Sequence, residues 1–175
     1  MRYFVQLTAW AACAALIPQP ALAQDLPPIE ESAADLAFGY CPLFLADKFS
    51  LTGAELKKHG FGTDISKVVH PTHGELTTVS SRRPDGEILF GGQAGRVCTV
   101  TIAGSKHGSA LAKLRTSMSF MGVDMKPVKS PASVPPVLTI ESFRGAVGEQ
   151  FLNLQLLTVG GPTPAVMTQM FVTGE

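Results

Sequence analysis

Two histidines and a carboxylate lie within six residues of one another, at His70, His73 and Glu75. Imidazole nitrogens and carboxylate oxygens are ligands that zinc uses in proteins. The segment also contains proline and glycine, so it lacks the helical spacing that puts two histidine ligands on one face of a helix. Two interpretations stay open: a metal site completed by a distant ligand such as His59 or His107, and loop histidines that precede a strand.

A second polar run places Ser105, Lys106 and His107 side by side between a predicted strand and a predicted helix. A hydroxyl beside an imidazole is the beginning of a nucleophile and base pair, and the amides at a helix start attract anions. The run is not the G-x-S-x-G motif, and the sequence indicates no carboxylate that would orient His107. A catalytic loop, a weak anion site and a polar loop with a helix cap are the alternatives.

The first 23 residues have the pattern of a cleavable secretory signal peptide. Arg2 supplies a positive start, residues 5–17 are mostly apolar, and Ala21-Leu22-Ala23 has the small residues that signal peptidase favours. The apolar stretch of about 13 residues is too short to span roughly 30 Å of hydrocarbon. We therefore expect cleavage after Ala23 and a periplasmic or secreted protein. Lipidation of Cys13 is the alternative.

Cleavage would remove one of the three cysteines and leave Cys41 and Cys98. An even number of cysteines in an oxidising compartment predicts a disulfide, and two free structural thiols are the alternative. Catalytic redox pairs are usually close in sequence as Cys-x-x-Cys, so we expect this bond to be structural. It would close a loop of about 58 residues and stabilise the fold by roughly 4 kcal/mol through loop-closure entropy.

Composition sets the broad class of the exported chain. Without residues 1–23 it has 152 residues, a typical length for one domain, and its net charge falls from zero to −1. We expect residues 24–31 to be a mobile leader and residues 32–175 to form a single globular domain. A nearly neutral chain argues against nucleic-acid binding. No later segment approaches 18 apolar residues, so no membrane span is expected after cleavage.

Charge is unevenly distributed along the chain. Residues 24–66 hold seven acids and three lysines, whereas residues 103–140 hold five basic residues and one acid. Those basic residues are Lys106, Lys113, Arg115, Lys126 and Lys129. Three interpretations stay open: a basic face for an anionic partner, a basic helix that packs near the acidic segment, and two charged segments that are simply solvated.

The chain that follows the leader is predicted to be helical. Ser32 is a potential helix cap, and Pro42 should end or kink that helix near Cys41. A second short helix is predicted from the capping box of Thr52 and Glu55. His59 would then lie as a cation near the C-terminus of this second helix, where it interacts favourably with the helix dipole.

Six strands are predicted from apolar alternation and turn residues. Their ranges are 76–82, 87–90, 96–103, 137–143, 150–159 and 165–173. The glycine-rich residues 91–95 are interpreted as a turn, and the proline-rich residues 127–136 as an extended connection. A helix with an apolar stripe lies between the two sets of strands. The stripe consists of Leu111, Leu114, Met118 and Met121.

Short turns between strands require antiparallel neighbours. The prediction is therefore an α+β fold: an antiparallel sheet of about five to six strands, with N-terminal helices and one central helix packed on one face. In general character the chain resembles small envelope proteins of Gram-negative bacteria, although no motif assigns it to a named family.

The motifs imply no cofactor and form no complete catalytic set. We therefore expect an exported, non-catalytic protein that binds an envelope protein or a small ligand. The alternative is a hydrolase or metal-dependent enzyme that uses the His70/His73/Glu75 loop or the Ser105/His107 loop.

Overall fold

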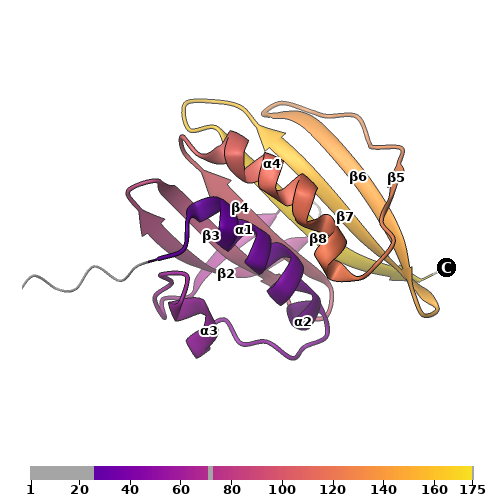
Figure 1. Ribbon diagram of the computed structural model, residues 1–175, viewed down its shortest axis with the longest axis horizontal. Helices are drawn as coiled ribbons and strands as arrows, with labels where there is room; N and C mark the ends of the chain where they lie inside the picture. The colour runs from indigo at the N-terminus through magenta and orange to yellow at the C-terminus, as the bar shows by residue number, and fades with distance from the viewer. Residues whose placement is uncertain (1–25, 71–72, 175) are drawn as a thin grey trace, which may run out of the picture.

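One antiparallel sheet organises the chain (Figure 1). The computed structural model describes residues 26–70 and 73–174, so the predicted signal peptide lies outside the described residues. Eight strands pair in the order β1-β2-β3-β4-β8-β7-β6-β5. The strands are β1 Ser66–His70, β2 Gly74–Arg83, β3 Gly86–Gln93, β4 Val97–Ala103, β5 Lys126–Val128, β6 Val137–Val147, β7 Gln150–Val159 and β8 Ala165–Gly174.

The α+β class and the antiparallel pairing are confirmed, but the expected count of five to six strands is wrong. The two strands that the sequence did not predict are the edges of the sheet, β1 and β5. Four of the five residues of β1 are exposed, so β1 has no apolar alternation that would reveal it. β5 has three residues, and Pro127 is one of them. Prolines are tolerated in edge strands because an edge has one side without ladder bonds.

The interpretation of residues 91–95 as a turn is wrong for Gly91 and Gly92. Both lie inside a strand, because β3 continues to Gln93. Gly91 has a φ of 151°, and a Cβ atom there would lie 2.1 Å from the carbonyl oxygen of Thr77 on β2. The two backbones therefore approach each other more closely than any side chain would allow.

A nearly continuous helical segment crosses the N-terminal half of the sheet. It consists of α1 Ile29–Ala34, the π-helical η1 Asp35–Tyr40 and α2 Cys41–Leu45. Of the two predicted effects of Pro42, ending or kinking the helix near Cys41, the first is wrong, because α2 continues to Leu45. Pro42 has no N–H group to donate, and the turn before it widens so that the N–H of Cys41 donates to Leu36 O. The helix begins at Ile29, which is fully buried, so folded structure starts before residue 32.

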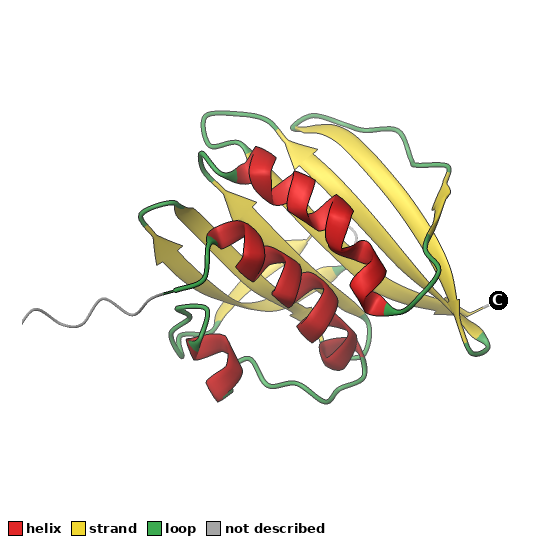
Figure 2. Ribbon diagram, in the orientation of Figure 1, coloured by secondary structure: helices red, strands yellow, loops and turns green. Residues whose placement is uncertain are grey.

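The remaining helices are α3 Ala54–Lys57, α4 His107–Ser117 and the 3-10 helix η2 Met118–Met121. The capping box predicted for α3 is absent: Gly53 is the cap residue, and no side chain caps the helix. α1 and α4 lie side by side on the same face of the sheet (Figure 2). No helix in the described part of the chain is long and apolar enough to cross a membrane.

The core lies between the sheet and this helical layer. Cys98, Val100 and Ile102 on β4 are all fully buried, as the alternation of β4 predicted. The Sγ atoms of Cys41 and Cys98 lie 1.99 Å apart, so the disulfide joins α2 to the middle of the sheet. The two cysteines that it links lie 57 positions apart in the sequence.

Candidate functional site

The structure separates the three predicted metal-ligand candidates into a pair and a single residue. The rings of His70 and His73 lie 5.0 Å apart at the end of the β1–β2 hairpin. Glu75 instead pairs with Lys67, with 2.8 Å between Oε1 and Nζ. Among residues 26–70 and 73–174, no three His, Cys, Asp or Glu side chains gather as a metal site. A metal held here would need ligands beyond the two histidine rings.

His73 reaches from this hairpin end to the far strand β8. Its Nε2 is in hydrogen-bonding contact with the side-chain amide of Gln169, and its ring lies 6.0 Å from that of Phe171. Burial lowers the pKa of His73, and the nearby His70 and Arg96 lower it further. Neutral imidazole is therefore favoured in this packed position.

The Ser105–Lys106–His107 loop makes local contacts at the start of α4. His107 Nδ1 lies 2.9 Å from Gly104 O, and Ser109 Oγ donates to Lys106 O at 3.0 Å. No side chain caps the helix. Among the described residues, no hydrogen bond joins Ser105 to His107. The loop thus brings together no nucleophile and base.

His59 follows the C-terminus of α3, as predicted, but its ring is buried, which does not favour the predicted cation. Its Nδ1 lies 3.1 Å from Ser32 Oγ, and burial lowers its pKa. Arg83 closes this buried cluster by donating to Pro27 O at 2.7 Å and to Ser32 Oγ at 3.1 Å. Arg83 also donates to His59 O. The cluster links α1 to β2. It could not be predicted from the sequence, because its members lie far apart along the chain.

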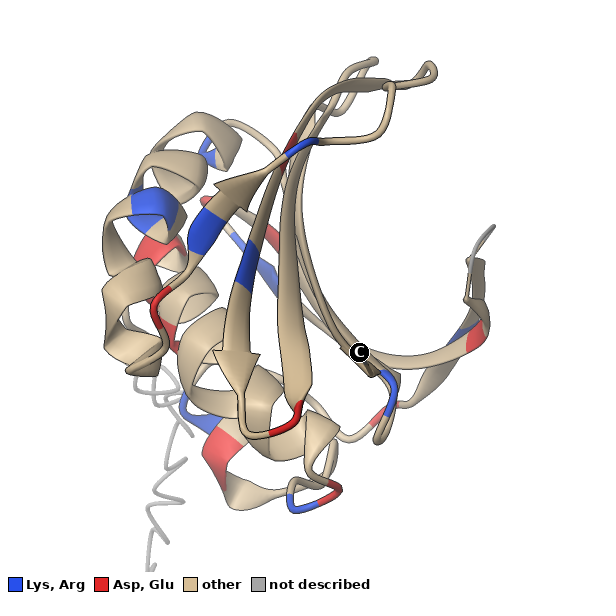
Figure 3. Ribbon diagram, turned by 90° about the vertical axis from the view of Figure 1, so that its right-hand side faces the viewer, with Lys and Arg blue, Asp and Glu red and all other residues tan. Residues whose placement is uncertain are grey.

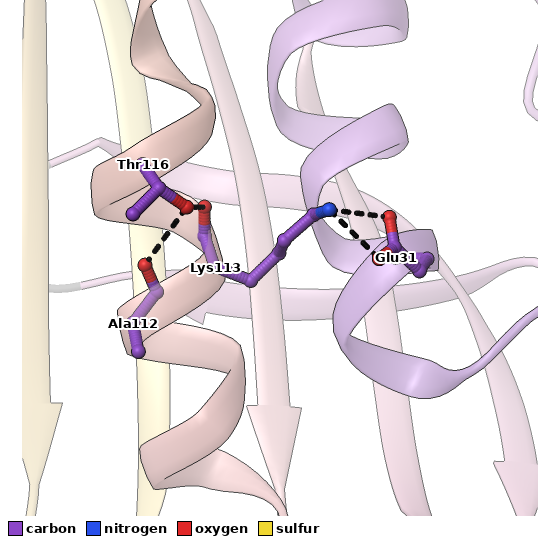
Figure 4. Close-up of polar contacts among 4 residues, drawn as sticks. All are labelled: Glu31, Ala112, Lys113 and Thr116. Carbon is purple, nitrogen blue, oxygen red and sulfur yellow. Dashed lines mark hydrogen bonds and ion pairs between the residues drawn. The ribbon is translucent and has the colours of Figure 1, made fainter.

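The basic residues Lys113 and Arg115 of α4 pair with acidic partners, and one of these partners, Glu31, belongs to the acidic segment near which the basic helix was predicted to pack. Lys113 Nζ lies 2.7 Å from the carboxylate of Glu31 on α1 (Figure 4). Arg115 Nε donates to Glu141 Oε2 on β6 at 3.0 Å. These two charges therefore connect elements of the fold. Lys126 and Lys129 lie outside α4, at the β5 edge.

The sheet has one covered face and one open face. In Figure 3 the helices lie on the convex side of the sheet, and the opposite, concave side carries no helix. We call this second side the open face. Its residues are those that alternate with the buried core positions of each strand. The three central strands β4, β8 and β7 contain no Asp, Glu, Lys or Arg.

A row of small and amide side chains crosses the middle of the open face. The register of the strands pairs each residue of this row with a residue on the neighbouring strand. The row runs Ser142, Gln155, Gln169, Thr99, Gly91 and Thr78, from β6 to β2. Gln155 Nε2 lies 3.4 Å from Ser142 Oγ, and Thr99 Oγ1 donates to Gly91 O at 3.2 Å. Amide and hydroxyl groups of this kind both donate and accept hydrogen bonds.

An adjacent row on the same face is mainly apolar. Its aligned members are Ile140, Leu157, Met167, Thr101 and Leu89. All of them are partly exposed, whereas the alternate positions Leu154 and Ile102 on the helical side are fully buried. The open face thus combines partly exposed apolar groups with uncharged hydrogen-bonding groups, most of which are buried among their neighbours.

The open face differs from the sites that single motifs had suggested. Neighbouring residues of its polar row lie 8 to 70 positions apart in the sequence, and only the strand order aligns them. The sequence feature that could have indicated this face is the absence of charged residues from 150–159 and 165–174. No protein-family model, curated protein or solved structure matches this chain.

Proposed function

We propose that this protein is an exported, non-catalytic binding protein that holds an envelope protein or small ligand on the open face of its sheet. The observation that carries the proposal is the absence of charged side chains from the central strands β4, β8 and β7 of the open face, where a polar row lies beside an apolar row. A sheet face that only contacts solvent usually carries polar and charged side chains, so partly exposed apolar residues on this face need another explanation.

Export is part of the proposal and has two supports. The first is the signal-peptide pattern of residues 1–23. The second is the Cys41–Cys98 disulfide, since such bonds persist mainly in oxidising compartments. A periplasmic or secreted location accounts for both.

A site-specific crosslinking experiment tests the binding role. A photoreactive amino acid is placed at Met167 or Leu157, two partly exposed positions of the open face. The matched control carries it at Thr116, an exposed position of α4 on the helical side. We expect crosslinked products from the two open-face positions, in the cells that export the protein, and none of the same mass from Thr116.

A charge placed in the central row provides the second arm of this experiment. Gln155→Lys should abolish the crosslink from Met167, because burying a lysine without a partner opposes binding. Thermal unfolding of the purified variant checks that the fold is retained. Identical products from both faces, or none from either open-face position, would contradict the proposal.

A further inference from the structure

We propose that one end of the open face binds a carboxylate, through the guanidinium of Arg144 with Lys129 and Lys126 beside it. This inference rests on the proposed binding role of the open face and adds the chemical class of the ligand. The site lies where β5, β6, β7 and β8 meet the loop that follows β5.

The Arg144 side chain is held in place by neighbours from β7. Its Nε donates to Asn153 Oδ1 at 2.9 Å, and its guanidinium carbon lies 5.4 Å from the centre of the Phe151 ring. Asn153 is buried, and its Nδ2 donates to Thr173 Oγ1 at 3.0 Å. The amide orientation of Asn153 is therefore fixed from the far side. A guanidinium oriented in this way presents its remaining N–H groups as a fork, the geometry that matches a carboxylate.

The positive charge at this end of the sheet is not balanced by the fold. Lys126 and Arg144 are direct cross-strand neighbours, with basic positions side by side on β5 and β6 in Figure 3. Like charges in that arrangement destabilise a sheet. Asp124 lies 3.5 Å from Lys126, but in the described part of the chain no ion pair involves Arg144 or Lys129. An anionic ligand would relieve this repulsion.

A cavity of about 150 Å³ lies at the same place. Arg144, Asn153, Gln155 and Thr173 line it from the sheet, and Lys129 from the loop after β5. A cavity of this volume is larger than one water molecule requires. It therefore has room for a carboxylate and the carbons that carry it. The amide and hydroxyl groups of the wall supply hydrogen bonds to polar atoms beside the charge.

Two sources of a carboxylate fit this chemistry: the C-terminus of a peptide and an acidic sugar. The probes are therefore used in matched pairs, each acid against its neutral counterpart. One pair is acetyl-trialanine with a free C-terminus and its C-terminal amide, and the other is galacturonate and galactose. Each is titrated into the exported protein, purified from cells that make residues 1–175, with backbone and side-chain amide NMR signals as the readout.

We expect at least one acid to shift the signals of Asn153 and Gln155 and to bind at least tenfold more tightly than its neutral counterpart. The variant Arg144→Gln should weaken that binding at least tenfold. Arg82→Gln is the matched control, since Arg82 is an exposed arginine at the other end of the sheet, paired with Glu87 at 2.9 Å. It should leave the binding unchanged. Raising the salt concentration should weaken binding of the acid only.

Three results would overturn the carboxylate site: equal binding of acid and neutral probes, equal losses in Arg144→Gln and Arg82→Gln, or tighter binding of inorganic phosphate than of either acid. The Met167 crosslink, measured in the Arg144→Gln background, separates this failure from that of the proposed function. If no acid binds but the crosslink persists, only the carboxylate site is wrong. If the unsubstituted protein neither binds an acid nor gives the Met167 crosslink, the binding role of the open face is wrong as well.

Discussion

The two halves of the protein share an arrangement but are stabilised by different interactions. Each half is a helical segment followed by four consecutive antiparallel strands, and the last strands, β4 and β8, pair in the middle of the sheet (Figure 1). The N-terminal half carries the disulfide and the buried Ser32–His59–Arg83 cluster. In the C-terminal half, α4 is linked to the sheet by apolar contacts and by the partly exposed ion pair of Arg115 and Glu141.

The helices explain this difference. In the N-terminal half the helical segment changes type twice within 17 residues, and 20 residues with only the four-residue α3 separate α2 from β1. Short helices gain little stability by themselves. In the C-terminal half α4 is a single helix of 11 residues with fully buried Ala110 and Leu114. The irregular half therefore requires crosslinks that the regular half does not.

Removal of the disulfide should have the largest effect on the N-terminal half. We expect Cys41→Ala/Cys98→Ala to lose about 4 kcal/mol of unfolding free energy, because the unfolded chain regains the entropy of an open loop between residues 57 positions apart. Urea unfolding measures the loss. As a control, a reducing agent should lower the stability of the natural protein and leave the double variant unchanged. Equal stability of oxidised and reduced protein would show that the N-terminal half does not depend on this bond.

Arginine substitutions compare the polar links of the two halves directly. We expect Arg83→Met to cost about 2–3 kcal/mol, because it removes the charged donor that Pro27 O, Ser32 Oγ and His59 O share in this cluster. Arg115→Met removes a partly exposed ion pair and should cost less than about 1 kcal/mol. Both are measured by urea unfolding at the same pH. Equal losses would contradict the distinction between a buried cluster and a surface pair.

Acidification should destabilise the N-terminal half through His59. Burial holds its pKa below the ordinary histidine value, so the unfolded chain binds a proton that the folded protein does not. Stability is therefore fully present above the unfolded pKa, near 6.5, and is lost as the pH falls below it. One such group contributes at most about 1.4 kcal/mol per pH unit.

The measurement is urea unfolding at pH 7.5, 6.5 and 5.5 for three proteins. The natural protein and the control His107→Gln should lose stability in parallel, whereas His59→Gln should lose less. Some slope should remain in His59→Gln, because burial also lowers the pKa values of His70 and His73. Parallel curves for all three proteins would exclude His59 as the source.

Sequence patterns predicted the features that repeat or pair, and missed those created by the fold. The six inner strands follow from alternation, and the Cys41–Cys98 bond from an even count of cysteines. The edge strand β1 was missed because exposed residues do not alternate, and the burial of His59 because Ser32 and Arg83 are distant in sequence.

The open face was missed for a related reason. Ser142, Gln155 and Gln169 become neighbours only through the register of β6, β7 and β8. The strand order reverses after β4, so that β8 and not β5 lies beside it. No spacing within one segment indicates this reversal. Candidate chemistry that lies within one loop is visible in a sequence, whereas chemistry spread over a sheet requires the register.

The smallest expected effect concerns the contact that joins the two helical segments, the pair of Glu31 on α1 and Lys113 on α4 (Figure 4). If the halves are held together mainly by the β4–β8 ladder and the core beneath it, this ion pair adds little. A double-mutant cycle of Glu31→Gln and Lys113→Met should give a coupling energy of about 0.5 kcal/mol, and less at high salt, because both side chains are partly exposed. A coupling above about 2 kcal/mol would mean that the helical layer and not the sheet unites the halves.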